Sequence, residues 1–110
     1  MSAAQAVGEP VAALVAEAGD DVAVVLSPVS AGGAVRLVGP REGSLAARQA
    51  VPQFHKIALV DRAAGEPLRR AGTVIGELTA PVVAGDLVHT HNLVSRRARA
   101  AAGKAGATGS

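Results

Sequence analysis

The sequence contains no cysteine, tryptophan or tyrosine, and Phe54 is its one aromatic residue. The absence of cysteine excludes disulfide bonds, thiolate metal sites and cysteine nucleophiles. The lack of rings removes the stacking platforms of single-stranded nucleic-acid surfaces, and it leaves a core of β-branched and methyl side chains.

No apolar run approaches the roughly 20 residues that span a bilayer. No Lys or Arg precedes Arg36, which argues against a secretory signal. We therefore expect a cytoplasmic protein with no membrane contact.

The formal net charge of +2 is unevenly distributed along the 110 residues. Segment 96–110 holds four basic residues and no acidic one, whereas the remaining body has seven basic residues against nine acidic ones. A nucleic-acid surface needs a basic face of the fold, so no specific nucleic-acid partner is expected. The Gly/Ala/Arg-rich tail buries too little surface to fix its backbone, and we expect it to be disordered.

Residues 1–19 are rich in alanine and predict a flexible leader or a short helix. Pro10 would start that helix and Gly19 would end it, with Val11–Ala18 between them. From residue 20 to 95 the chain changes to short apolar runs separated by Gly and Pro, which is typical of strands and turns. Segment 44–50 is expected to be a loop or a single helical turn. The expected strands are Val22–Leu26, Val35–Val38, Lys56–Val60, Gly72–Leu78, Val82–Val83 and Leu87–Leu93.

A short string recurs four times in this region. It reads apolar-x-Ala-Gly-x-x-apolar, and a glycine at a fixed place between apolar positions indicates a tight turn that needs a positive φ. The spacing of the copies is unequal, which excludes a solenoid. The pattern predicts a compact, mostly β domain of short strands joined by similar turns. The copies are Val29–Val35, Val82–Val88, Arg62–Leu68, whose first position is not apolar, and a degenerate Val51–Ile57 with Gln53-Phe54 in place of Ala-Gly.

Two of the three histidines, His89 and His91, stand in segment Leu87–Leu93. If this segment is a strand, both imidazoles lie on one face. They could then ligate a divalent metal, with His55 as a third ligand, or contact a substrate carboxylate or transfer a proton. Alternatively, they only bond backbone carbonyl groups at the strand end. His55 follows a turn of the repeat, where a side chain is typically displayed.

An ordered set of segments resembles the SAF-type (β-clip) domain of the altronate/galactarate dehydratase family. The resemblance covers about 20–95, and a stand-alone form of this domain serves as the small subunit of related lyases such as sulfolactate sulfo-lyase. The segments are His55–Leu59, Ala64–Pro67, Gly72–Gly76, Ala84–Asp86 and Val88–Leu93.

The resemblance implies a role in carbohydrate metabolism as the small subunit of a sugar-acid or hydroxy-acid dehydratase or related lyase. Such a subunit contributes part of the substrate site, while a large catalytic subunit carries most of that site and the divalent metal, for which Fe²⁺ is the candidate. Three positions depart from the family pattern: Phe54 replaces a glycine, Ala71 replaces an aromatic residue, and Arg62 replaces an apolar one. These departures are compatible either with a different substrate or with a loss of activity.

The residues and their positions also suggest individual roles. The catalytic candidates are His55, His89 and His91, and the last two are also the metal candidates. The candidates for binding the anionic substrate are Lys56, Arg70 and Asn92. Each has a plainer alternative: a solvated strand-edge lysine, a solvated turn, and an asparagine that caps its own backbone.

The chief alternative function is a non-catalytic β-clip module that binds carbohydrate or protein, and an assembly factor that uses the basic tail is a third. A homo-oligomer in isolation is compatible with each. Activity seen only in a mixture with a large chain favours the lyase.

Overall fold

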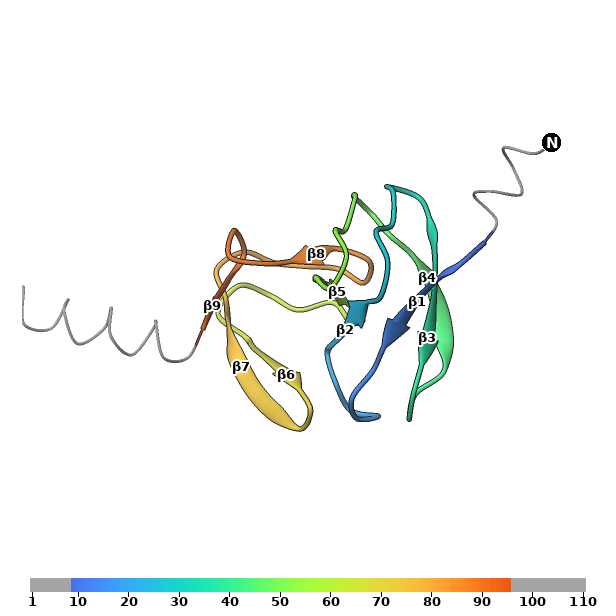
Figure 1. Ribbon diagram of the computed structural model, residues 1–110. Coiled ribbons are helices and arrows are strands. Elements are labelled where there is room, and N and C mark those ends of the chain that lie inside the picture. The colour runs from blue at the N-terminus through green and yellow to red at the C-terminus, as the bar shows by residue number, and fades with distance from the viewer. Residues whose placement is uncertain (1–8, 96–110) are drawn as a thin grey trace, which may run out of the picture.

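The structure is a computed structural model that describes residues 9–95, and within this range it consists of strands and turns. The strands form a six-stranded sheet in the order β4-β3-β1-β2-β5-β8 and a three-stranded sheet in the order β6-β7-β9 (Figure 1). The strands are β1 (Val11–Leu14), β2 (Val22–Val25), β3 (Ala34–Val38), β4 (Gly43–Ala46), β5 (Lys56–Ala58), β6 (Pro67–Arg70), β7 (Thr73–Leu78), β8 (Leu87–Val88) and β9 (Leu93–Ser95).

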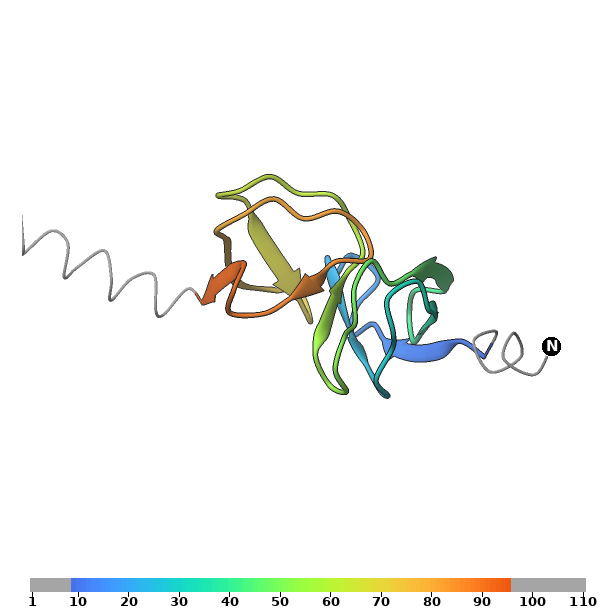
Figure 2. The ribbon, with the colours of Figure 1, turned by 90° about the horizontal axis from the view of Figure 1, so that it is seen from above.

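The two sheets lie side by side, and β2, β5 and β8 stand between β1, β3 and β4 on one side and the three-stranded sheet on the other (Figures 1 and 2). All pairings are antiparallel except that of β1 with β3. The mostly β, compact, SAF-like fold expected from the sequence is confirmed. In the described part of the chain, no helix is long and apolar enough to cross a membrane.

Strand β2 is buried on both faces, as its continuous apolar run predicts. Val25 packs in a core cluster within the curl of the six-stranded sheet, whereas Val22 packs in a second cluster shared with the three-stranded sheet. Strand β5 behaves in the same way, because Ile57 belongs to the first cluster and Ala58 to the second. This central pair of strands therefore joins the two halves of the core.

The four recurring strings form four equivalent turns. The predicted positive φ occurs at Gly32, Gly65 and Gly85, with values of 81°, 88° and 99°, and at Phe54, with 67°. The first positions of the strings pair with one another as isolated bridges, Val29 with Val51 and Arg62 with Val82. The repeat inferred from the sequence is thus confirmed as a structural unit, including its degenerate copy.

Two expectations for the N-terminal half are wrong. Val11–Leu14 is strand β1 and not a helix, because it lies between β3 and β2 and pairs with both. A helix of eight residues is only marginally stable without docking. As a strand, Val11–Leu14 instead forms backbone hydrogen bonds with both β2 and β3. The ordered body therefore begins before residue 20. The first half of segment 44–50 is not a loop or helical turn but part of strand β4, which pairs with β3. Residues 1–8 of the expected leader and the expected disordered tail 96–110 lie outside the described residues.

The expected strand Leu87–Leu93 is also wrong. Strand β8 ends at Val88, a tight turn follows, and β9 begins at Leu93 and pairs with β7 in the other sheet. The backbone N–H groups of Asn92 and Leu93 donate to the carbonyl oxygen of His89 at 3.0 and 2.9 Å, which closes the turn. The chain passes from one sheet to the other at the two histidines.

Candidate functional site

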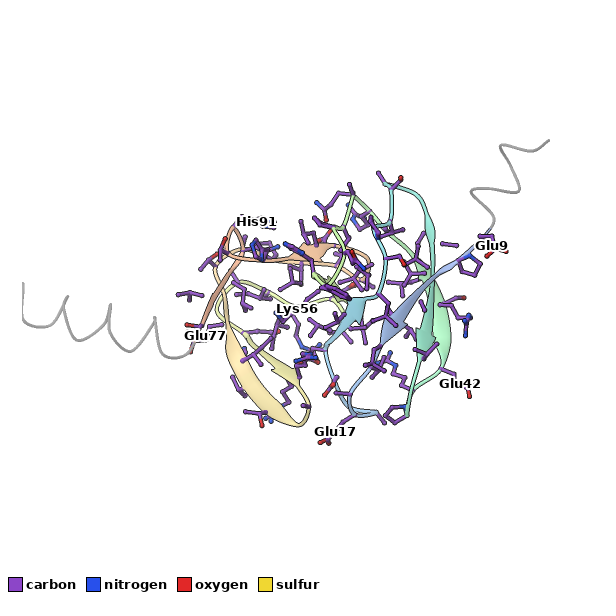
Figure 3. All side chains as sticks on the ribbon, viewed as in Figure 1. Glu9, Glu17, Glu42, Lys56, Glu77 and His91 are labelled. Atoms are coloured by element: carbon purple, nitrogen blue, oxygen red, sulfur yellow. The ribbon has the colours of Figure 1, made fainter. Side chains whose placement is uncertain are left out.

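A pocket of about 380 Å³ lies between the two sheets, and it collects three of the residues singled out in the sequence. Lys56 comes from β5, Arg70 from the end of β6, and His89 from the turn after β8. Figure 3 shows Lys56 near the centre of the molecule and His91 at its edge, on the turn between β8 and β9. The rest of the wall is mainly apolar and includes Ile75, Val88 and Leu93.

Strand alternation directs both cations toward this space. Ile57 is fully buried in the first core cluster, so its neighbour Lys56 faces the other side, where the three-stranded sheet lies. On β6, Leu68 is buried and Arg69 is exposed, and Arg70 returns to the inner side. Two strands of different sheets thus bring two positive charges to one pocket.

Neither cation of the pocket has an acidic partner among residues 9–95. The ion pairs in this range involve other basic residues, Arg48 with Asp86 and Arg62 with Asp21 and Glu66. Lys56 and Arg70 are both partly buried, which reduces the screening of their charges by water and salt. Two unpaired cations in a concave, partly apolar site attract an anion.

The histidines His55 and His89 form a pair beside this pocket. Their ring centroids are 4.6 Å apart with the planes tilted by 50°. The Nδ1 atom of His55 lies 3.2 Å from the carbonyl oxygen of Gln53. This hydrogen bond requires a hydrogen on Nδ1 and leaves Nε2 of the neutral ring as a proton acceptor. His89 lines the pocket and is exposed, so it connects the pocket with His55.

His89 and His91 do not share a strand face, because both lie in the turn between β8 and β9. The expectation of a metal ion on this pair depended on two imidazoles on one strand face, and that arrangement does not occur. Within the described range, no three His, Cys, Asp or Glu side chains lie close enough together to hold a metal ion. His91 is exposed at the outer part of the turn and does not line the pocket.

Asn92 is engaged with the backbone of its own turn. Its Oδ1 atom accepts a hydrogen bond from the N–H of His89 at 3.0 Å, and its Nδ2 donates to the carbonyl oxygen of Leu87 at 2.8 Å. Only 6% of the residue is exposed. Of the two roles considered for Asn92, this geometry favours the structural one, in which the side chain holds the turn that carries His89 and His91.

Sequence reasoning missed the role of Asp20 and Asp21, which directly precede strand β2. Both are buried, and their carboxylates bind backbone N–H groups of the β6–β7 hairpin. Burial by itself raises the pKa of the Asp20 carboxyl, but the hydrogen bonds from backbone N–H groups outweigh burial and hold the pKa below its usual value. A pair of adjacent acids before a buried strand is a signal, but the sequence does not say which backbone groups it binds.

The departure at Arg62 finds its explanation in the same cluster. Its Nη2 atom lies 3.2 Å from Oδ1 of Asp21, and its Nε lies 4.0 Å from Oε2 of Glu66. A buried carboxylate is costly without a partner, and Arg62 provides one for Asp21. The basic residue in place of an apolar one is therefore part of the packing between the sheets.

A cationic pocket between two packed sheets, in a domain built from four similar turns, defines the chain as a β-clip domain with a candidate anion site. The altronate/galactarate dehydratase SAF domain family matches residues 11–96. The chain belongs to this family, whose domain occurs in dehydratases, a class of lyases. The match begins at the first residue of β1, in agreement with the earlier start of the ordered body. No curated protein matches the chain.

Proposed function

We propose that the chain supplies one wall of the substrate site of a sugar-acid or hydroxy-acid dehydratase, or of a related lyase, and works as a small subunit together with a large catalytic subunit. Membership of the dehydratase SAF domain family supports the reaction class. The observation that carries the proposal is the convergence of Lys56 and Arg70, neither paired with an acid among the described residues, in the pocket beside His89.

The two cations bind the substrate carboxylate. The guanidinium of Arg70 can hold both carboxylate oxygens through two parallel hydrogen bonds, and the ammonium of Lys56 adds a second positive charge. The apolar wall excludes water around the carbon chain and strengthens these contacts. Both interactions gain strength as negative charge develops on the carboxylate, so they stabilise the transition state more than the bound substrate.

The reaction is a β-elimination. A base removes the proton on the carbon next to the carboxylate, the carbon–oxygen bond one carbon further breaks, and the departing hydroxide takes up a proton and leaves as water. His89 is the base, because it lines the pocket, and His55 contacts its ring. The enol that remains tautomerises to a 2-oxo acid.

We assign the divalent metal, for which Fe²⁺ is the candidate, to the large subunit. The donor groups of residues 9–95 do not fit a metal site of their own. We therefore derive no step of the reaction from a metal bound to this chain.

The large subunit would cover the face of the molecule at Phe54. This residue is 66% exposed, and it directly precedes His55. Leu26 is 38% exposed, and its carbonyl oxygen accepts a hydrogen bond from the side chain of Gln53, the residue before Phe54. An exposed aromatic residue beside the histidine pair is a suitable anchor for a subunit that completes the site, since aromatic residues dominate the binding energy of many interfaces.

The second candidate is a binding module without catalytic activity. The same pocket supports it, because two cations and an apolar wall bind a carboxylated sugar whether or not His89 transfers a proton. The two functions share the ligand and differ in the role of the histidines.

The test has a binding part and an activity part. Galactarate should bind the isolated chain, and Arg70→Gln or Lys56→Gln should weaken binding by about tenfold each in calorimetry. Arg36→Gln, an exposed arginine on β3 outside this pocket, is the matched control and should leave the affinity unchanged. Galactarate binding that does not respond to either pocket substitution would exclude this site.

For activity, the chain is mixed with a large catalytic subunit of the dehydratase class, and formation of the 2-oxo acid is followed. His89→Gln should abolish turnover and leave galactarate binding and the circular dichroism spectrum unchanged. Binding without turnover in any mixture would favour the binding module.

A further inference from the structure

Hydrogen bonds from two buried acids fix the backbone on both sides of Arg70. Oδ2 of Asp21 accepts the N–H of Arg69 at 2.9 Å, and the N–H of Asp21 donates to the carbonyl oxygen of Arg69 at 3.0 Å. On the other side, Oδ2 of Asp20 accepts the N–H of Ala71 at 3.0 Å. Arg70 is therefore the one residue between two anchored neighbours.

The same two acids adjoin the sheet that carries Lys56. Asp20 and Asp21 directly precede β2, and 1% and 5% of their surfaces are exposed. The carbonyl oxygen of Asp21 accepts the N–H of Leu59, just after β5, at 2.8 Å. Strand β2 also pairs Val24 with Lys56. The acids thus connect the end of β6 to the two strands that determine where the ammonium group lies.

The acids bind the main chain around Arg70 and leave its charge free. No ion pair joins Arg70 to either carboxylate in residues 9–95, and the charge of Asp21 is instead met by Arg62 at 3.2 Å. An acid that paired with the guanidinium would compete with the substrate carboxylate. Because the carboxylates bind N–H groups instead, they can orient Arg70 without neutralising it.

We infer that Asp20 and Asp21 are positioning residues of the anion pocket, which hold the backbone on both sides of Arg70 so that its guanidinium is oriented toward the substrate carboxylate. The inference rests on the proposed function, because the acids act on binding only if Arg70 binds the substrate carboxylate.

A double-mutant cycle on the full chain tests this inference with galactarate as the probe. Asp20→Asn should weaken binding by about tenfold in the wild-type background and have no further effect when Arg70 is already glutamine. In a Lys56→Gln background the same substitution should still weaken binding by about tenfold, which makes this pair the matched control. An equal loss in all three backgrounds would show a general structural role and overturn the inference.

A ligand-free measurement separates this inference from the proposed function. In NMR relaxation of the arginine Nε–H groups, Asp20→Asn should increase the mobility of the Arg70 side chain and leave that of Arg36 unchanged. If galactarate does not bind the wild-type chain, the proposed function fails, and the mobility of Arg70 alone decides whether the acids position it. If Asp20→Asn does not fold, Asp21→Asn is measured in the same way, because it removes the anchor on the other side of Arg70. An unchanged Arg70 in the folded variant would overturn the inference.

Discussion

The β6–β7 hairpin contains a local conflict between residue type and backbone conformation that is open to direct measurement. Register pairs Arg70 with Thr73, which leaves a two-residue loop of Ala71 and Gly72 with φ values of 55° and 76°. Positive φ at both loop residues is the type I′ turn, for which Asn-Gly is preferred. An alanine in the left-handed region costs about 1–2 kcal/mol. Glycine removes this cost but loses about 0.5–1 kcal/mol through the greater freedom of the unfolded chain.

Ala71→Gly should therefore stabilise the fold by about 0.5–1 kcal/mol, and Ala71→Asn by about 1 kcal/mol because asparagine tolerates the left-handed region without the loss in the unfolded state. The corresponding rise in melting temperature is about 2–8 °C. The chain has no tryptophan or tyrosine, so unfolding in urea is followed by far-ultraviolet circular dichroism. Neither substitution removes the N–H that donates to Asp20.

The control is Ala50→Gly, at an exposed alanine outside the left-handed region, which should lose about 0.5–1 kcal/mol. The reasoning is refuted if Ala71→Gly destabilises the chain as much as this control does.

Three further predictions test other parts of the fold by urea unfolding. Gly76→Ala should cost about 2 kcal/mol, because the new Cβ would meet the carbonyl oxygen of Val94 on β9, whereas Gly19→Ala meets nothing within 4 Å and should be nearly neutral. The lowered pKa of Asp20 means that its ionised form stabilises the fold above the ordinary value of 3.8 and that this contribution is lost as the pH falls below it. The unfolding midpoint of the wild type should thus fall more steeply below that pH than that of Asp20→Asn, and parallel curves would contradict this. Asn92→Ala should cost about 1–3 kcal/mol through two lost backbone hydrogen bonds, and Asn92→Asp should not restore this stability, because its buried carboxylate faces the carbonyl oxygen of Leu87 in place of the donor.

The turns of this fold could be predicted because their cause is local. A positive φ excludes most side chains through contacts within the residue itself, so glycine at a fixed place in a repeated string is a reliable signal. Even the copy with Phe54 was identified, since its apolar flanks keep the spacing. Strand β2 was predictable for a similar reason, as its run of apolar residues is long enough to need cover on both faces.

Strand β1 and the turn at His89 were missed because their causes are distant in the sequence. Val11–Leu14 has the composition of a helix and becomes a strand through its pairing with β3, which begins about twenty residues later. Segment Leu87–Leu93 has the alternation of a strand, but the side chain of Asn92 folds back and closes a turn. Propensity and periodicity describe a segment alone, and neither contains the partner strand that decides between two states.

The candidate site arises where one of the four equivalent turns differs from the others. Glu66 and Asp86 occupy the position after the left-handed residue in two of these turns, and their carboxylates fold back to accept N–H groups of their own turns. His55 occupies the same position after Phe54, and its ring both bonds the carbonyl oxygen of Gln53 in its own turn and contacts His89 of another strand connection. The repeat thus provides two turns closed by their own carboxylates, one turn with Gly33 at this position, and a fourth whose side chain also contacts the histidine of the pocket. A histidine at this position could be placed from the sequence, whereas its contact with His89 depends on the turn that the sequence did not reveal.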